Sequence, residues 1–216
     1  MKILLIGASG RTGSLILKKA LADKHEVTVI ARDPSKIKAP NAKIITGTPY
    51  DSDTVKSAVL NCEAVVSTLN ISRASDNPWA KLRAPKDLIS VSIKNALAAM
   101  KENNVKRIIT LSALGAGDSK KKMPFIFNLL ISCSNLNYAY AEHTRQEEIL
   151  AESDSNWTVI RLPMLKNEEG EGEILINRND NVKLNKNINR DSVARFVLSI
   201  LSDQKYYKTI VGISCK

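Results

Sequence analysis

A glycine-rich turn, Gly7-Ala8-Ser9-Gly10-Arg11-Thr12-Gly13, most strongly limits what this chain can fold into. It follows the apolar run Lys2–Ile6 and precedes a helix-patterned stretch, Ser14–Asp23. Glycines let the chain turn tightly and let a phosphate approach the backbone, and a helix N-terminus offers free N–H groups. The spacing G-x-x-G-x-x-G differs from the simplest dinucleotide fingerprint, G-x-G-x-x-G. A plain helix-capping turn is the alternative, but the strand before it and the helix after it favour a phosphate site.

The next strand-like segment, Glu26–Ala31, ends at Arg32 and Asp33. In a βαβ nucleotide unit, the residue that closes the second strand faces the adenosine ribose. An acid there suits NAD, whereas an arginine suits the 2′-phosphate of NADP. Arg32 stands at this position, with Ser9 and Arg11 on the facing turn, so we expect NADP(H). If Asp33 pointed at the ribose instead, the preference would shift to NAD.

Length and composition indicate an ordinary globular protein. The chain has 216 residues, of which 44% are hydrophobic and 25% charged, and we expect one domain over residues 1–216. There is no apolar run of about 18 residues and no secretory signal pattern at the N-terminus. We therefore expect a cytoplasmic protein with no membrane partner, and the sequence leaves its oligomeric state open.

The net charge of +10 raises the question of nucleic-acid binding. The lysines are dispersed, however, and the tightest cluster, Lys120-Lys121-Lys122, has no interleaved aromatic residues. We expect a solvated basic surface, which would also favour a polyanionic cofactor, and no nucleic-acid partner. The three cysteines show neither a C-x-x-C pair nor metal-ligand spacing, so no metal site is expected.

Apolar patterning alternates between strands and helices along most of the chain, which predicts an α/β fold with a doubly wound parallel sheet. Further strands are expected at 42–46, 63–68, 106–111, 157–161 and 209–213. Helices are expected at 51–60, 89–100, 141–153 and from 191 onward. Segment 125–131 reads as helix or loop, and segment 168–172 as a flexible acidic loop.

Four segments together resemble the atypical short-chain dehydrogenase/reductases: GASGRTG at 7–13, VTVIARDPSKI at 27–37, ITLSALGAG at 109–117 and AEHTRQEEILAESDSNWTVIRLP at 141–163. Within them, the chain is most similar to the NAD(P)H-binding group that includes biliverdin reductase B and NmrA-like proteins. The resemblance implies a Rossmann fold with NADP(H) across the C-terminal ends of the strands. It also implies a small substrate-side lid towards the C-terminus.

The resemblance assigns roles to individual residues. The pyrophosphate turn would comprise Gly7, Ser9, Gly10, Arg11, Thr12 and Gly13, with Arg32 on the 2′-phosphate. Near the nicotinamide and its ribose would lie Leu69, Asn70, Ser112, Arg161, Leu162 and Pro163. His143 matches a histidine on the corresponding helix of biliverdin reductase B.

Two departures from the family pattern affect the expected chemistry. Thr48 stands where the family often has an acid that reaches towards adenine, and with Pro49 it would offer a hydroxyl and an apolar wall. Ordinary short-chain dehydrogenases use Tyr-x-x-x-Lys, in which the lysine lowers the tyrosine pKa. Tyr138 is followed four residues later by Glu142, and Tyr140 by a threonine. Tyrosine-mediated alcohol oxidation or sugar epimerisation is therefore not expected.

Reduction of a flat conjugated acceptor does not require that pair, because the hydride comes from the cofactor. We expect a small-molecule acceptor such as a flavin, a quinone or a linear tetrapyrrole. Ser112 would bind the carboxamide or the acceptor, or cap the strand end. Tyr138 and Tyr140 would stack on the acceptor or pack on a lid. For His143 a polar surface position is favoured over a general acid.

A second function class stays open at this point. The chain could be a non-catalytic NADP(H)-binding redox sensor of the NmrA-like type. Turnover of NADPH with an acceptor would distinguish the reductase from the sensor.

Overall fold

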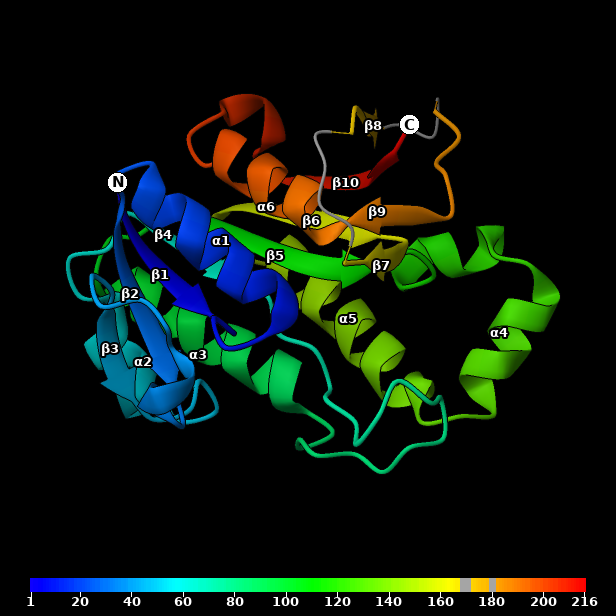
Figure 1. The fold of residues 1–216 in the computed structure, drawn as a ribbon, viewed down its shortest axis with the longest axis horizontal. Helices are drawn as coiled ribbons and strands as arrows, with labels where there is room; N and C mark the ends of the chain where they lie inside the picture. Colours follow the sequence, from blue (N-terminus) through cyan, green and yellow to red (C-terminus); the bar gives the residue numbers. More distant parts are fainter. Residues whose placement is uncertain (168–171, 179–181) are drawn as a thin grey trace.

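The computed structural model describes residues 1–167, 172–178 and 182–216. Its centre is an eight-stranded sheet in the order β3-β2-β1-β4-β5-β6-β10-β8 (Figure 1). The strands are β1 (Lys2–Ile6), β2 (Glu26–Ala31), β3 (Lys43–Thr46), β4 (Ala64–Ser67), β5 (Arg107–Ala113), β6 (Asn156–Leu162), β8 (Ile174–Asn177) and β10 (Thr209–Cys215). Strands β7 (Met164–Lys166) and β9 (Asn187–Asn189) form a separate small parallel sheet.

Every neighbouring pair from β3 to β10 is parallel, and β8 alone pairs antiparallel, at the edge beside β10. The expected doubly wound parallel sheet is therefore confirmed. Strands β2 and β3 are added in turn on one side of β1. The chain then crosses to the other side of β1, where β4, β5 and β6 follow in turn. Neighbouring strands β1 and β4 mark the point where the strand order reverses, which is where open α/β sheets bind their ligands.

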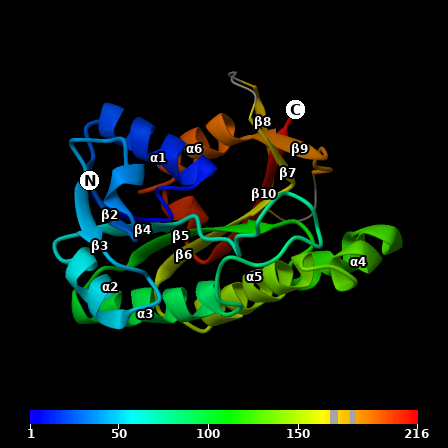
Figure 2. The same ribbon diagram turned by 60° about the horizontal axis from the view of Figure 1, so that its bottom comes forward.

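Helices cover both faces of the sheet (Figures 1 and 2). Helices α1 (Arg11–Ala22) and α6 (Arg190–Ser199) lie on one face, and α2 (Ser52–Val59), α3 (Leu88–Glu102) and α5 (Leu136–Ala151) on the other. Helix α4 (Phe125–Ser132) and the 3-10 turns η1 (Pro34–Lys36), η2 (Gly117–Lys122) and η3 (Gln204–Tyr206) complete the list. None of the helices in the described ranges is long and apolar enough to cross a membrane.

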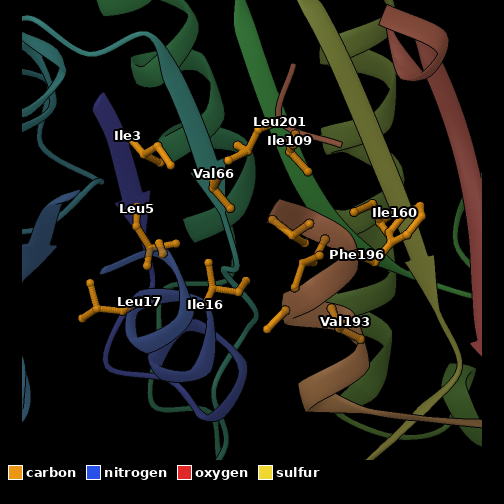
Figure 3. Close-up of a cluster of buried hydrophobic side chains, with 14 of the residues drawn as sticks. Ile3, Leu5, Ile16, Leu17, Val66, Ile109, Ile160, Val193, Phe196 and Leu201 are labelled. Carbon is orange, nitrogen blue, oxygen red and sulfur yellow. The ribbon is translucent and has the colours of Figure 1, made fainter. Parts of the chain in front are cut away.

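The side chains of each central strand alternate between two buried clusters. Leu5 packs on one face with Ile16 of α1 and Val193 of α6 (Figure 3). Its neighbour Leu4 points to the other face and packs in the cluster that contains Ile93 of α3. Burial on both faces explains why these strands are almost continuously apolar.

Most element positions expected from the sequence are confirmed within a few residues. Asp51 caps helix α2 as expected, and its carboxylate accepts a hydrogen bond from the Thr54 amide at 3.0 Å. Segment 125–131 is a helix rather than a loop. Residues 168–171 of the expected acidic loop lie outside the described residues.

Two helix starts were wrong. Helix α1 begins at Arg11 rather than Ser14, because the Gly10 carbonyl already accepts the first helical hydrogen bond, from the Ser14 amide at 2.9 Å. Helix α5 begins at Leu136, five residues before the expected start. A tertiary contact fixes that end, since the Asn135 amide donates to the Pro78 carbonyl at 3.0 Å.

Candidate functional site

The C-terminal ends of six parallel strands bring the expected cofactor residues to one edge of the sheet. Gly7 follows β1, Arg32 follows β2, and Thr48 and Pro49 come two and three residues after β3. On the other side of β1, Leu69 and Asn70 follow β4, Ser112 lies near the end of β5, and β6 ends at Arg161, Leu162 and the adjoining Pro163. In the β5–β6 register, Ser112 pairs with Arg161.

Gly7 and Gly13 allow the turn after β1 to fold against the start of α1. Gly7 has a positive φ of 88°, which side chains other than glycine rarely adopt. At Gly13 a Cβ atom would lie 2.2 Å from the Gly7 carbonyl oxygen. The Thr68 hydroxyl, which the sequence did not single out, donates to the carbonyls of Ile6 and Gly7 at 3.2 Å each. These two glycines are therefore needed for the fold of the turn itself.

Gly10 is different, because a Cβ atom there would make a single tight contact rather than several close ones. Its φ of −79° suits any residue, and the nearest atom to a built Cβ is the Gly7 carbonyl oxygen at 3.2 Å. Gly10 is the N-cap of α1, and no side chain caps that helix terminus. Ser9 and Arg11 are exposed on either side of it, and Thr12 is buried. The first-turn amides therefore have no capping side chain among the described residues, which suits a pyrophosphate.

The structure separates the roles of Arg32 and Asp33. Asp33 caps η1, and its carboxylate accepts from the Ser35 amide at 3.1 Å and the Ser35 hydroxyl at 2.6 Å. The hydrogen bond from Ser35 holds the pKa of Asp33 below its usual value. Arg32 is exposed, and within the described residues no partner holds its guanidinium. Arg32 is thus the available side chain at the end of β2.

The remaining residues on the adenine and ribose side make local contacts. The Thr48 hydroxyl accepts from the Tyr50 amide at 3.3 Å, and the Pro49 carbonyl accepts from the Asn95 side chain at 3.2 Å. The Asn70 side chain accepts from the Ile71 amide at 2.8 Å. Leu69 packs partly buried against the cluster under α3. All of them shape the edge of the sheet without a charged group.

Arg11 has a partner that the sequence did not predict. Its guanidinium donates to both carboxylate oxygens of Asp76, at 3.0 and 3.4 Å. Asp76 lies in the segment between β4 and α3, and the charges of Arg11, Arg73 and Arg190 all lower its pKa, with the Arg11 hydrogen bond contributing most. Three arginines therefore gather around one carboxylate beside the glycine turn.

A buried polar network lies at the ends of β5 and β6. The Ser112 hydroxyl donates to a carboxylate oxygen of Glu147 at 2.7 Å. The Arg161 guanidinium donates to the same carboxylate at 2.6 and 3.1 Å, and also pairs with Asp118 at 2.5 Å. Burial alone would lower the pKa of Arg161, but the two carboxylates raise it. The Ser112 hydroxyl proton is thus used in the bond to Glu147 and does not cap the strand end. The Ser112 oxygen can still accept a hydrogen bond.

His143 is buried, with 5% of its surface exposed, so the preferred expectation of a surface position was wrong. It lies on the side of α5 that faces the sheet, with Ala139, Gln146 and Glu147. Its Nδ1 atom is buried without a hydrogen-bond partner, and burial lowers its pKa from 6.5 to about 4. His143 is therefore neutral at pH 7 and carries no acidic imidazolium proton to donate.

The buried His143 predicts a loss of stability in mild acid. As the pH falls from 6.5 towards 4, the unfolded chain binds a proton that the folded chain does not. We expect the free energy of unfolding to fall over that window by up to about 3 kcal/mol. Urea titrations across this pH range measure it. His143→Gln should flatten the profile over this window, and an equally steep profile in that variant would contradict the assignment to His143.

The two tyrosines lie on different sides of α5. Tyr140 shares a side with His143 and Glu147, and its ring meets that of Phe127 edge-on, with centroids 6.1 Å apart. Burial raises the pKa of Tyr140, and the nearby charge of Arg73 opposes this only in part. Tyr140 therefore keeps its proton at neutral pH, and its ring lies beside Gly115, two residues after β5.

Tyr138 has a lysine partner that helical spacing could not reveal. Lys86, in the segment before α3, donates to the Tyr138 hydroxyl at 3.0 Å, with its Nζ 4.3 Å from the ring centroid. The residue four positions after Tyr138 is Glu142, and its carboxylate accepts from the amide of Ser90 in the first turn of α3 at 2.8 Å. Glu142 occupies the sequence position at which ordinary short-chain dehydrogenases carry the lysine. Here its carboxylate stabilises the N-terminus of α3 instead.

Sequence reasoning missed Glu147, Asp76 and Lys86. Glu147 was open to detection, because it follows Tyr140 by seven residues and His143 by four, on one side of a helix. No comparable signal existed for Asp76 or Lys86, which lie in the irregular segment between β4 and α3. Within the described residues, no group of three or more potential ligand side chains forms a metal site.

Comparisons with known proteins agree with this geometry. A family model described as NAD(P)H-binding matches residues 7–204. An uncharacterized protein of Bacillus subtilis (strain 168), YwnB, is 49% identical over 45 residues, which is 21% of each chain. The matched segment therefore covers only about a fifth of the length of that relative.

Solved structures share the fold over nearly the whole chain. ChuY, an anaerobillin reductase from Escherichia coli O157:H7, has a TM-score of 0.80 at 18% identity, covering 99% of this chain and 97% of that one. A short-chain dehydrogenase/reductase of Veillonella parvula DSM 2008, solved in complex with NADP, has a TM-score of 0.77 at 19% identity, covering 99% and 94%.

Proposed function

The chain belongs to the NAD(P)H-binding family, and from this premise we propose that it is an NADPH-dependent reductase of a flat conjugated acceptor: a flavin, a quinone or a linear tetrapyrrole. The observation that carries the proposal is the arrangement at the strand ends. An uncapped helix terminus follows β1, and Arg32, which has no partner within the described residues, follows β2. Near the end of β5, the half-buried Tyr140 shares a side of α5 with the buried His143. The reductase named among the similar structures is in keeping with it.

The cofactor preference rests on the separation of Arg32 from Asp33. The capping role of Asp33 leaves Arg32 as the residue that can reach a 2′-phosphate. A guanidinium binds phosphate through two parallel hydrogen bonds, each stronger than a neutral one. The fit to a dinucleotide also rests on Gly10, where a side chain would fill the space that a pyrophosphate needs.

When bound, NADPH supplies the hydride, and the protein positions the two reactants. The first-turn amides of α1 would hold the pyrophosphate, and the Ser112 oxygen can accept a hydrogen bond from the carboxamide. Tyr140 would form one wall against the acceptor ring. His143 is neutral at pH 7, so we assign the proton that follows the hydride to solvent.

Steady-state assays with NADPH and a panel of acceptors test the proposal. FMN, menadione and biliverdin represent the three acceptor classes. We expect NADPH oxidation that depends on both enzyme and acceptor. Tight NADPH binding without turnover on any of the three would contradict the reductase and support the redox sensor.

Arg32→Ala should weaken NADPH binding far more than NADH binding, because only NADPH carries the 2′-phosphate. A charged hydrogen bond is worth roughly 1.5–3 kcal/mol, so the NADPH affinity should fall by about 10–150-fold. Calorimetric titration of both cofactors gives the ratio. Lys36→Ala, which removes an exposed charge that pairs with Asp33, is the control. Equal weakening of both cofactors by Arg32→Ala would make Arg32 structural.

Tyr140→Phe and Tyr138→Phe should each keep most of the activity. Phenylalanine preserves the ring and removes only the hydroxyl, and among the described residues no lysine is paired with Tyr140 to stabilise a phenolate. A positioned general acid contributes about 10²–10⁴-fold, so a loss of that size in kcat would identify a tyrosine acid. Tyr138→Phe tests in particular the pair that Lys86 forms with the Tyr138 hydroxyl. Tyr140→Ala should raise KM for the acceptor by removing the wall.

A further inference from the structure

Helix α4 stands at one end of the molecule (Figures 1 and 2). Several of its apolar side chains are exposed to solvent. Only Asn128 and Ser132 of its eight residues are polar. Phe125 and Ile126 are each 78% exposed, and Leu129 is 50% exposed. Large contiguous apolar patches are uncommon on monomeric proteins and mark interaction sites.

The opposite side of α4 is already occupied by the protein. Ile131 is buried, and Phe127 packs its ring against Tyr140. Trp79, which is 59% exposed, is tied to the end of the same helix, since its indole N–H donates to the Cys133 carbonyl at 2.9 Å. The outward side of α4 and Trp79 are therefore held in place as one exposed apolar surface.

Two exposed lysines adjoin this surface. Lys120 and Lys121 lie near the end of η2, which Met123 and Pro124 separate from α4. The Asn128 side chain donates to the Lys120 carbonyl at 3.1 Å, which fixes the lysine turn to the helix. Asp118 of the same turn pairs with Arg161 and also interacts with the charge of Lys122, so Lys122 is left out of the surface. We define the α4 surface as Trp79, Lys120, Lys121, Phe125, Ile126 and Leu129.

We propose that the α4 surface docks the protein on the face of an anionic lipid bilayer. Exposed apolar side chains next to lysines are the combination that binds the boundary between headgroups and acyl chains. Tryptophan suits the same boundary, because its ring is apolar and its N–H is polar. A peripheral contact needs no spanning helix, so this proposal revises the expectation that the chain has no membrane partner.

Charge favours lipid over a second copy of the chain or another protein. Lysine is depleted in the cores of protein interfaces. The net charge of +10 makes two copies repel each other when their lysine turns meet. An anionic bilayer gains from the same charges, because each lysine near its surface strengthens binding.

Vesicle co-sedimentation of the whole protein tests the proposal. The probes are vesicles of phosphatidylcholine alone and vesicles that contain one quarter phosphatidylglycerol, each in low and high salt. We expect binding to the anionic vesicles that weakens in high salt, and little binding to the neutral ones. Trp79 emission should shift to the blue on binding, while Trp157, which is only 8% exposed, should contribute a constant signal.

Two variants locate the contact. Ile126→Ser and the double change Lys120→Glu with Lys121→Glu should each weaken binding to anionic vesicles by about tenfold or more. Their controls are Leu60→Ser, at a residue 51% exposed elsewhere, and Lys18→Glu with Lys24→Glu, which changes the net charge equally. Absence of vesicle binding would overturn the proposal, as would equal losses in the controls. A dimer that Ile126→Ser dissociates, without vesicle binding, would assign the surface to a second copy.

Discussion

Gly10→Val should still fold and should lose NADPH binding. The Gly10 backbone has a φ that valine accepts, and its built Cβ makes one tight contact, with the Gly7 carbonyl oxygen at 3.2 Å, which a small shift of the turn relieves. The added side chain would occupy space at the helix terminus that a pyrophosphate needs. Losing two charged hydrogen bonds of roughly 1.5–3 kcal/mol each weakens binding by about a hundredfold or more. Calorimetric titration with NADPH measures the loss, and thermal unfolding confirms that the variant is folded.

Gly13→Ala is the contrasting variant in the same turn. Its Cβ would lie 2.2 Å from the Gly7 carbonyl oxygen, so the turn and the start of α1 must shift. We expect a clear fall in the melting temperature of Gly13→Ala, and little fall for Gly10→Val. A folded Gly10→Val protein that binds NADPH as tightly as the parent would remove the glycine turn from the cofactor site.

Glu147→Gln should destabilise the fold strongly. Glu147 and Arg161 are both buried, and their side chains form a paired hydrogen bond at 2.6 and 3.1 Å. Removing one charge of a buried pair typically costs about 3–5 kcal/mol, because the other charge stays buried. Asp118 remains beside Arg161, so we expect a value near the lower end, about 3 kcal/mol. Urea unfolding at neutral pH gives the change in the free energy of unfolding.

Glu148→Gln is the matched control, since Glu148 is the next residue on α5 and is exposed. It should change the free energy of unfolding by less than about 0.5 kcal/mol. If the two variants proved equally stable, the network at the ends of β5 and β6 would contribute nothing measurable to the fold. Glu147→Gln also removes the charge that Ser112 donates to, so its effect on KM for NADPH reports whether Ser112 is positioned by Glu147.

The sequence by itself determined the seven parallel strands of the main sheet, most of its helices and the glycine turn, but not strands β7, β8 and β9. Strands β1 and β2 end at Ile6 and Ala31, where the apolar runs of the sequence end. Asp51 caps α2, because its side-chain oxygen can accept a hydrogen bond from a first-turn amide. These features depend on neighbours within a few residues, through side-chain period, capping and glycine geometry. The same local logic placed Arg32 and Ser112 at the ends of their strands, and hence at one edge of the sheet.

Only the tertiary structure decided what the site side chains contact. Ser112 and Glu147 are 35 residues apart, Lys86 and Tyr138 are 52 apart, and Arg11 and Asp76 are 65 apart. No periodicity links positions so distant. The burial of His143 was hidden for the same reason: a helix pattern shows which residues share a side, while the depth of that side depends on the sheet packed against it. Local chemistry therefore fixed the elements, and long-range packing fixed the partners and protonation of the residues they carry.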